Sequence, residues 1–394
     1  GGRLPQERGC RGVSEQASRA VPSGIPETRI RKDDLFSRLP PEWPDSGLSE
    51  EIDGYIRRSG RAVVALDDDP TGVQTVHGVK VLTGWAVSDL RPPLEAGERL
   101  FFVLTNTRSY PLPRAVEINE EIAANLTAAA RASGTGFVVV SRSDSTLRGH
   151  YPGELEALGR TLSSGLGRQF DGQIIVPAFF EGGRFTIGDI HWVAEGEWLV
   201  PAAQTEFARD NAFGYRHSDL RRWVEEKTVG GVKAPEVVSV SLEDIRRGGP
   251  DRVEDVLAGV DAGRPVIVNA ASYVDLRVFT LGLLRAESRG KNFLYRSAAS
   301  FVKVRAGISD RGPLTRAEVY GGIESCGGGG LIIVGSHVKK TTEQLEAALA
   351  LGGFVATELS VPKILDQATR EQEIVRSCHE AESGLAGGSD VLVY

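Results

Sequence analysis

Residues 63–72, Val-Val-Ala-Leu-Asp-Asp-Asp-Pro-Thr-Gly, form an apolar run that leads directly into three acids, a proline, a threonine and a glycine. Continuous runs of valine, leucine and isoleucine are typical of buried parallel strands, and open α/β sheets bind ligands beyond the carboxyl ends of such strands. Adjacent carboxylates repel one another unless a cation, a positively charged side chain or water faces them. The stretch therefore predicts a buried strand followed by a chemically active loop, with a solvated acidic turn as the plain alternative.

The remaining sequence alternates between strand-like and helix-like segments. Such alternation is typical of mostly parallel sheets covered by helices, so we expect an α/β fold of two domains with helix-flanked sheets. Hydrophobic periodicity predicts strands at 62–66, 79–83, 100–105, 136–141, 173–177, 237–241, 265–269, 331–335 and 353–358, and helices near 114–132, 152–163, 218–227, 273–288 and 341–350.

Irregular stretches suggest how the chain divides into domains. Residues 1–30 are rich in glycine, arginine, serine and proline. We therefore expect a flexible leader over residues 1–34. The run Cys326-Gly-Gly-Gly-Gly330 predicts a hinge, or else a surface loop, near a domain boundary between about 310 and 330. We therefore expect a first domain at 35–315 and a second at 330–394. Because Asp390–Tyr394 resembles a strand on which the sequence stops, we expect the second domain to be incomplete.

Composition excludes several classes of function. Hydrophobic residues make up 41% of the chain and charged residues 25%, as in globular proteins. The net charge of −7 disfavours attraction to nucleic-acid phosphates, and no apolar run is long enough to predict a membrane span. The three cysteines lack metal-ligand spacing and suit a reducing cytoplasm. We expect a cytoplasmic protein that binds small molecules, and the sequence leaves a homodimer open.

A second constellation is Val138-Val-Val-Ser-Arg-Ser-Asp-Ser-Thr-Leu-Arg-Gly-His150, again an apolar run that opens into polar residues. Arg142 and Arg148 could hold a carboxylate or phosphate through paired guanidinium hydrogen bonds, with Ser145 and Thr146 as hydroxyl partners. In the alternative, a polar residue at 143–145 such as Asp144 only caps the next helix while the arginines pair with surface acids. The first interpretation predicts an anionic ligand.

Two further segments have a glycine where a strand ends. The strand that starts at Ile174 leads to Gly182-Gly183-Arg184, a turn that could let backbone approach a ligand. The strand at 331–334 leads to Gly335-Ser336 and then a helix, whose expected cap is Thr341 or Thr342. The amino end of a helix attracts phosphate groups, although many ordinary α/β turns also need a glycine there.

The acidic loop also fits a haloacid dehalogenase-like phosphatase. Its pattern of an apolar strand followed by Asp-x-Asp-x-Thr is satisfied by Asp67, Asp69 and Thr71, and residues 101–105 imitate the second motif. Asp67 would then be the phosphate-accepting nucleophile and Asp69 the acid/base. The sequence lacks a later strand ending in paired acids that would complete a magnesium site. An ordinary dehydrogenase is disfavoured, because glycines rather than acids would follow the strand.

Together these segments resemble the four-carbon acid sugar kinase family, formerly a domain of unknown function. The resemblance extends over about 320 residues in the family's order and is carried by Asp68-Asp69-Pro-Thr71-Gly72, Asp144-Ser-Thr-Leu-Arg148-Gly149, Pro177-Ala-Phe-Phe-Glu-Gly-Gly-Arg184-Phe-Thr186, Thr205-Glu-Phe-Ala-Arg-Asp210, Phe213-Gly214 and Val334-Gly-Ser-His337. Asp67 is an extra acid, and Pro70 stands where many members carry Leu or Phe. This variant is similar to a longer subgroup with Asp-Asp-Asp-Pro-Thr-Gly, and family members continue past the position of Tyr394.

The resemblance implies an N-terminal domain that binds a sugar acid and a C-terminal domain that binds ATP. Members phosphorylate the terminal hydroxyl of threonate, erythronate or their 3-oxo forms, with Mg²⁺. Arg148 would clamp the substrate carboxylate, Asp69 would orient or deprotonate the hydroxyl, and Asp68 would help to organise the metal. A sugar-acid-binding fragment without catalysis is a third hypothesis. The other implied residues are Thr71, Gly72, Asp144, Ser145, Gly183 and Arg184 for the substrate and Gly335 and Ser336 for the nucleotide.

Overall fold

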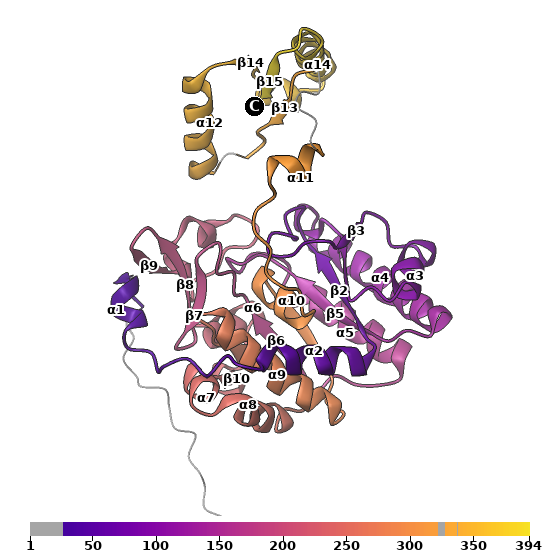
Figure 1. Ribbon diagram of the computed structural model, residues 1–394, viewed down its shortest axis with the longest axis vertical. Coiled ribbons are helices and arrows are strands. Elements are labelled where there is room, and N and C mark those ends of the chain that lie inside the picture. The colour runs from indigo at the N-terminus through magenta and orange to yellow at the C-terminus, as the bar shows by residue number, and fades with distance from the viewer. Residues whose placement is uncertain (1–26, 322–327, 337) are drawn as a thin grey trace, which may run out of the picture. The chain divides into compact units, whose positions relative to one another are not determined.

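The computed structural model describes residues 27–321, 328–336 and 338–394, and the chain divides into two compact units, residues 1–310 and 311–394 (Figure 1). Residues 1–26 of the expected leader, and Cys326 and Gly327 of the expected hinge, lie outside the described residues. None of the helices within the described ranges is long and apolar enough to cross a membrane. Cys378 is a free, exposed thiol.

The first unit is built around an eight-stranded sheet in which every neighbouring pair of strands is parallel. This confirms the predicted α/β class. In spatial order the strands are β10 (Val238–Val240), β11 (Arg264–Val268), β6 (Gly172–Val176), β12 (Phe293–Ser297), β5 (Phe137–Arg142), β2 (Ala62–Asp67), β4 (Leu100–Leu104) and β3 (Lys80–Leu82).

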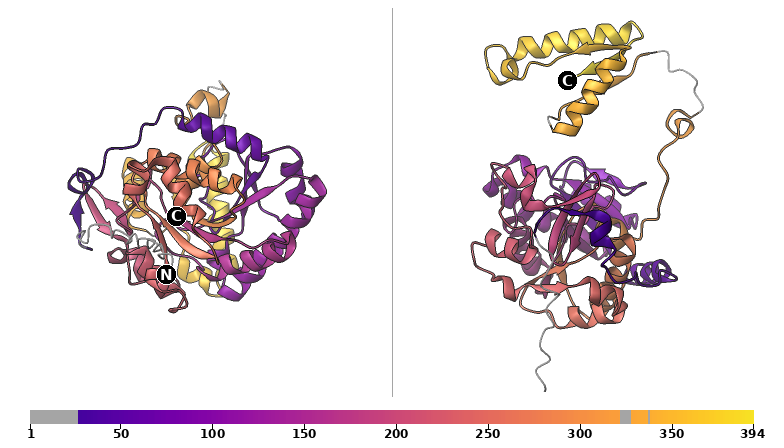
Figure 2. Two further views of the ribbon diagram at one scale, coloured as in Figure 1. Left: turned by 90° about the horizontal axis from the view of Figure 1, so that it is seen from below. Right: turned by 90° about the vertical axis from the view of Figure 1, so that its left-hand side faces the viewer.

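Helices cover both faces of this sheet (Figure 2), and the two hydrophobic cores explain why β2 is apolar throughout. Successive strand residues point to opposite faces, so Val63 and Ala65 join one core while Val64 and Leu66 join the other. Burial of each valine or leucine contributes about 1.5–3 kcal/mol. The first core packs on α2 (Leu48–Ser59), α8 (Gly249–Ala258), α9 (Tyr273–Ser288) and α10 (Ala299–Arg305), and the second on α3 (Val87–Glu95), α4 (Leu112–Ser133), α5 (Gly153–Leu166) and α6 (Leu220–Lys227).

A smaller antiparallel sheet, which the sequence did not predict, completes the first unit. Its order is β1 (Ile30–Arg31), β9 (Trp198–Pro201), β8 (Ile190–Glu195) and β7 (Arg184–Ile187), and it shares a core with α1 (Lys32–Phe36). Residues 30–34, which we expected in the leader, lie in this sheet and helix because Ile30 pairs with Leu199 and Leu35 is buried. Shorter elements are α7 (Leu242–Arg246), η1 (Thr107–Ser109), η2 (Ala202–Gln204), η3 (Glu206–Arg209) and η4 (Ala234–Glu236).

The second unit contains a parallel sheet of order β13 (Leu331–Ile333), β15 (Asp390–Val393) and β14 (Phe354–Thr357). The expected cap at Thr341 or Thr342 is wrong, because α12 begins at Lys339 after Val338 and the Thr342 hydroxyl donates back to the Val338 carbonyl. The helices of this unit are α11 (Arg316–Tyr320), α12 (Lys339–Leu351), α13 (Val361–Leu365) and α14 (Arg370–Ala386).

Candidate functional site

The loops after β2 and β5 leave the large sheet at the point where its strand order reverses. After β2 the chain first adds β3 and β4 on one side, and it then returns to place β5 on the other side. Asp67 at the end of β2 pairs with Arg142 at the end of β5. Open α/β sheets bind ligands at such reversals, and here the acidic and arginine loops predicted from the sequence start side by side.

Asp67, the first acid of the loop, is buried and enclosed. Its side chain accepts a hydrogen bond from Arg142 at 3.3 Å, and only 3% of the residue is exposed. Burial raises the pKa of Asp67 to about 7; Arg142 opposes this shift, whereas Asp69 and Asp68 add to it. A Cβ atom at Gly72 would lie 1.6 Å from the Asp67 Oδ2 atom, so the loop can close over this carboxyl group only with a glycine there.

Asp68, the second acid, is buried and fully hydrogen-bonded. Arg108 donates to both carboxylate oxygens, at 2.5 Å and 3.2 Å, and the Ser143 hydroxyl donates to Oδ2 at 2.7 Å. The close packing continues at Gly149, which has a φ of +114° and whose added Cβ would lie 2.7 Å from the Ser143 hydroxyl. Asp68 therefore joins the loops after β2, β4 and β5.

Asp69, the third acid, is the most accessible of the three. Its side chain is 23% exposed and lies 2.7 Å from Arg108, while the Thr71 amide and hydroxyl donate to Oδ1 at 2.8 Å and 2.5 Å. Burial works to raise the pKa of Asp69, but Arg108, the two Thr71 hydrogen bonds and Arg142 together lower it. Asp69 is thus an ionised, partly open carboxylate at neutral pH.

Asp144 and Arg148 form the next part of the same network. Asp144 accepts from the Arg148 side chain at 2.8 Å and from the Thr146 hydroxyl, and it lies 3.8 Å from Arg108. Burial opposes ionisation of Asp144, yet its hydrogen bond and charge interaction with Arg148 hold its pKa well below the usual range. The remaining Arg148 nitrogen faces Asp210 at 3.8 Å. The structure thus brings together Asp68, Asp69, Asp144 and Arg148.

Arg184 lies beside this network with fewer partners. Its guanidinium carbon is 5.7 Å from the centre of the Phe207 ring, and that of Arg148 is 5.1 Å from the same ring. Within the described residues no carboxylate reaches ion-pair distance of Arg184, and its Nε atom is buried without a hydrogen-bond acceptor. Burial lowers the pKa of Arg184; Asp144 opposes this shift and Arg148 adds to it. Two guanidinium groups thus share one aromatic ring, and Arg148 pairs with Asp144 whereas Arg184 has no ion-pair partner among the described residues.

The backbone around Gly183 explains the placement of Arg184. Gly183 has a φ of +74°, and a Cβ atom there would lie 2.7 Å from the Ala194 side chain on β8. Phe179 and Arg184 exchange backbone hydrogen bonds across this tight turn. The turn therefore returns the chain directly into β7, with Arg184 as its first residue.

Several residues of the site were not found from the sequence. Arg108 follows β4 and carries the central positive charge, but nothing near it in sequence shows that its partners lie about 40 residues away. His191 is buried in β8, where the Ser145 carbonyl and the Thr186 hydroxyl bind its two ring nitrogens at 2.7 Å and 3.0 Å. Burial lowers the pKa of His191 to about 4, so it holds the Ser145 loop as a neutral side chain.

Arg296 is a third residue that sequence reasoning missed. It is buried in β12, which was itself not predicted, and donates to the Arg148 carbonyl at 3.0 Å. Its guanidinium lies 5.0 Å from the Trp223 ring, its Nη1 atom has no acceptor, and burial lowers its pKa. Through this hydrogen bond, Arg296 holds the backbone of the loop that carries Arg148.

The acids of the site do not fit a magnesium ion. Throughout the described parts of the chain, no three His, Cys, Asp or Glu side chains are placed to hold a metal together. Asp68, which we expected to organise Mg²⁺, directs both oxygens at Arg108 and Ser143. A metal ion would have to displace these donors before it could bind.

The expected nucleotide residues lie in the second unit, between β13 and α12. Gly335 and Ser336 are exposed, and the Ser336 hydroxyl accepts from the Val338 amide at 3.4 Å. A glycine and a serine just before the amino end of a helix are a common setting for phosphate binding.

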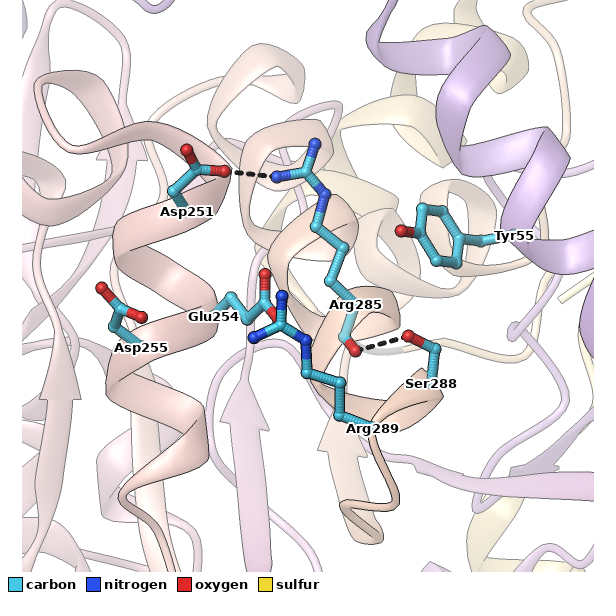
Figure 3. Close-up of a pocket in the computed structure, with 7 residues that line it drawn as sticks. All are labelled: Tyr55, Asp251, Glu254, Asp255, Arg285, Ser288 and Arg289. Carbon is cyan, nitrogen blue, oxygen red and sulfur yellow. Dashed lines mark hydrogen bonds and ion pairs between the residues drawn. The ribbon is translucent and has the colours of Figure 1, made fainter.

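The first unit also has a polar surface hollow of about 430 Å³ between α2, α8 and α9 (Figure 3). It shares no residue with the acid and arginine network. In Figure 3 Arg285 reaches Asp251, and Arg289 lies 2.7 Å from Glu254, so opposite charges in the hollow pair with one another. The site at the strand ends is therefore the better candidate for chemistry.

Comparison with known proteins identifies both units. A family described as a sugar-binding N-terminal domain matches residues 63–305, which is more than half of the chain. A family described as a nucleotide-binding C-terminal domain matches residues 331–394. No curated protein matches the sequence significantly.

Solved structures share the fold at low sequence identity. A structure from Salmonella typhimurium LT2, described as a candidate tRNA synthase, is 15% identical with a TM-score of 0.57, over 84% of this chain and 74% of that one. A Haemophilus influenzae protein is 17% identical with a TM-score of 0.49, over 84% and 74%. A Bordetella bronchiseptica domain of unknown function, a domain-swapped dimer with bound citrate, is 16% identical with a TM-score of 0.43, over 84% and 73%.

The likeness to the Salmonella structure shows the fold alone, whereas the two domain matches show the relationship. The order of a sugar-binding domain and a nucleotide-binding domain is the order that the sequence motifs predicted. The chain belongs to the four-carbon acid sugar kinase family.

Proposed function

We propose that this chain is an ATP-dependent kinase that phosphorylates the terminal hydroxyl of a four-carbon sugar acid such as threonate, erythronate or a 3-oxo form. The observation that carries the proposal is the pair of guanidinium groups of Arg148 and Arg184 at the Phe207 ring, next to the ionised Asp69 network. The pair of domain families supports a sugar-acid substrate and a nucleotide.

Arg184 is the main ligand of the substrate carboxylate in this proposal. It has no acidic partner among the described residues and a buried Nε atom without an acceptor, so a bound carboxylate would satisfy both. Arg148 already donates to Asp144 and has one nitrogen turned toward Asp210 at 3.8 Å. Arg148 would therefore bind the same carboxylate through this remaining side, in keeping with its predicted role as a clamp of the substrate carboxylate.

Asp69 receives the proton of the substrate hydroxyl, or orients that hydroxyl for attack. It is the acid of the loop that is both partly exposed and ionised, and Thr71 fixes the orientation of its carboxylate. Phosphoryl transfer needs mainly positioning and charge neutralisation, which an ordered carboxylate and nearby arginines supply. Gly335 and Ser336 would bind the phosphates of ATP through the amino end of α12.

The haloacid dehalogenase-like alternative is disfavoured by the surroundings of Asp67. A nucleophile must be deprotonated and reach its substrate, but Asp67 is buried, is packed against Gly72 and has a pKa raised to about 7 by burial. A sugar-acid-binding protein without catalysis is the outcome that remains if no transfer is detected.

The test is a coupled assay of ADP release over a panel of four-carbon acids, with Arg184→Lys and the control Arg160→Lys, which changes an exposed arginine paired with Glu120. Lysine keeps the charge but loses the planar fork, so we expect the KM for the acid to rise roughly ten- to a hundredfold in Arg184→Lys, with the KM for ATP unchanged. The control should behave as wild type. An unchanged KM for the acid, or no ADP release with any four-carbon acid, contradicts the proposal.

A further inference from the structure

Arg108 occupies the centre of the acidic network. Its Nη2 atom lies 2.5 Å from Asp68 and 2.7 Å from Asp69, its Nε atom is 3.2 Å from Asp68, and its Nη1 atom is 3.8 Å from Asp144. The side chain is 15% exposed. One guanidinium thus faces three carboxylates, which is the arrangement that a bound divalent cation often has in acidic phosphoryl-transfer sites.

The oxygen atoms of these acids are already committed to N–H and O–H donors. Both oxygens of Asp68 accept from Arg108, and one also accepts from Ser143. Asp69 uses Oδ1 for Thr71 and Oδ2 for Arg108. Magnesium needs about six oxygen ligands near 2.0–2.1 Å directed at a single point, whereas these oxygens converge on the nitrogens of Arg108.

Backbone hydrogen bonds fix Arg108 in this place before any ligand binds. The Arg108 amide donates to the Asp68 carbonyl at 3.2 Å, and the Thr105 amide and hydroxyl donate to the Asp67 carbonyl at 2.9 Å and 2.8 Å. Asn106, between them, has a positive φ of 51°. The loop after β4 is therefore tied to the loop after β2, so the guanidinium does not depend on a flexible side chain alone for its position.

We propose that Arg108 is a built-in replacement for a divalent cation, so that the sugar-acid-binding unit carries no metal site of its own. One consequence of this proposal rests on the proposed function: any metal used in phosphoryl transfer enters with the nucleotide phosphates. The other titratable and charged groups around the three acids include Arg142, Asp67, Arg148, Arg184, Arg296, Glu154 and Asp210.

The test uses Mn²⁺ as the probe and measures the melting temperature of the full chain without nucleotide or sugar acid. All five tryptophans, at positions 43, 85, 192, 198 and 223, lie in the first unit, so their fluorescence follows the unfolding of that unit. The variants are Arg108→Gln and the control Arg114→Gln, which changes an exposed arginine paired with Glu117. We expect the wild type and the control to melt at the same temperature in EDTA and in millimolar Mn²⁺.

Arg108→Gln leaves three facing carboxylates without their cation, so we expect its melting temperature to fall by several degrees in EDTA and to recover in Mn²⁺. A folded Arg108→Gln protein that does not respond to Mn²⁺ contradicts the proposal. If this variant does not fold, the wild type decides together with Asp68→Asn. If the melting temperature of the wild type rises in Mn²⁺ and this rise is lost in Asp68→Asn, the proposal is overturned. If the wild type melts at the same temperature in EDTA and in Mn²⁺, the proposal is supported. Neither arm uses substrate, so failure of the kinase proposal would leave this result unaffected.

Discussion

The loop after β2 and the loop after β13 both follow the carboxyl end of a parallel strand, but they differ in how their polar atoms are used. In the first, Asp68 and Asp69 bind arginine, serine and threonine side chains within the same unit. In the second, Gly335 and Ser336 are exposed, and the Ser336 hydroxyl accepts from the Val338 amide at 3.4 Å. The acid site is therefore organised in advance by its own side chains, whereas the loop at Gly335 and Ser336 is exposed, as the proposed role in nucleotide binding requires.

The largest effect should come from Asp69→Asn, which removes the accessible base of the organised loop. Asparagine can still accept from Thr71, so the fold should survive, whereas kcat should fall roughly 10²–10⁴-fold because proton transfer is lost. Steady-state ADP release measures this, with Asp261→Asn, an exposed acid paired with Arg264, as the control. A kcat within twofold of wild type would show that Asp69 is not the base.

The first unit should become less stable as the pH rises, because the acidic loop buries Asp67. Folding raises the pKa of Asp67 to about 7 through burial, so this stabilising contribution is complete below the unfolded pKa of about 4 and is lost as the pH rises through 7. The loss is at most about 4 kcal/mol, because each unit of pKa corresponds to roughly 1.4 kcal/mol. Asn cannot titrate, so Asp67→Asn should lose less stability than wild type between pH 5 and pH 8.

Urea unfolding followed by tryptophan fluorescence at those two values of pH measures the difference for the first unit. We expect the wild type to lose about 2–3 kcal/mol more than Asp67→Asn over this interval, because only the part between pH 5 and pH 7 contributes. Equal losses in the two proteins would mean that Asp67 is ionised in the folded state across the whole range.

The smallest effect should come from Ser336→Ala in the exposed loop. The hydroxyl makes one weak internal hydrogen bond, so stability should not change, and the loss of one bond to a phosphate should raise the KM for ATP by about two- to tenfold. Ser383→Ala, on the exposed face of α14, is the matched control. A raised KM for the sugar acid with no change for ATP would place Ser336 outside the nucleotide site.

Continuous apolar segments were the part of the fold that could be predicted. β2 and β5 are buried on both faces, and each has an uninterrupted apolar run of at least four residues, 62–66 and 137–140, before its polar end. The predicted helix at 273–288 has the bounds of α9, because Ser272 and Asp275 form a capping box at its start. β12 was missed although it lies inside the sheet, because its apolar part has only three residues, 293–295, before Arg296 and Ser297.

The site could be predicted only in part for a related reason. Asp68, Asp69, Asp144 and Arg148 stand in conspicuous loops directly after strands, so their positions in sequence indicated a shared edge of the sheet. Arg108 and His191 have no such pattern, and their partners become visible only when β4 and β8 are placed. The short strands of the small sheet were missed because they pair through tight turns and have little periodicity.

The most direct test of the kinase assignment follows the γ-phosphoryl group of ATP in a reaction with threonate or erythronate. The chain is incubated with ATP that carries ¹⁸O in its γ-phosphate. The label is then sought by ³¹P NMR in the phosphorus signals of the sugar acid and of free phosphate. We predict that the label moves to the terminal hydroxyl of at least one four-carbon acid and that Asp69→Asn strongly reduces this transfer. Label found only in free phosphate, or left on ATP with every acid tested, would contradict the assignment.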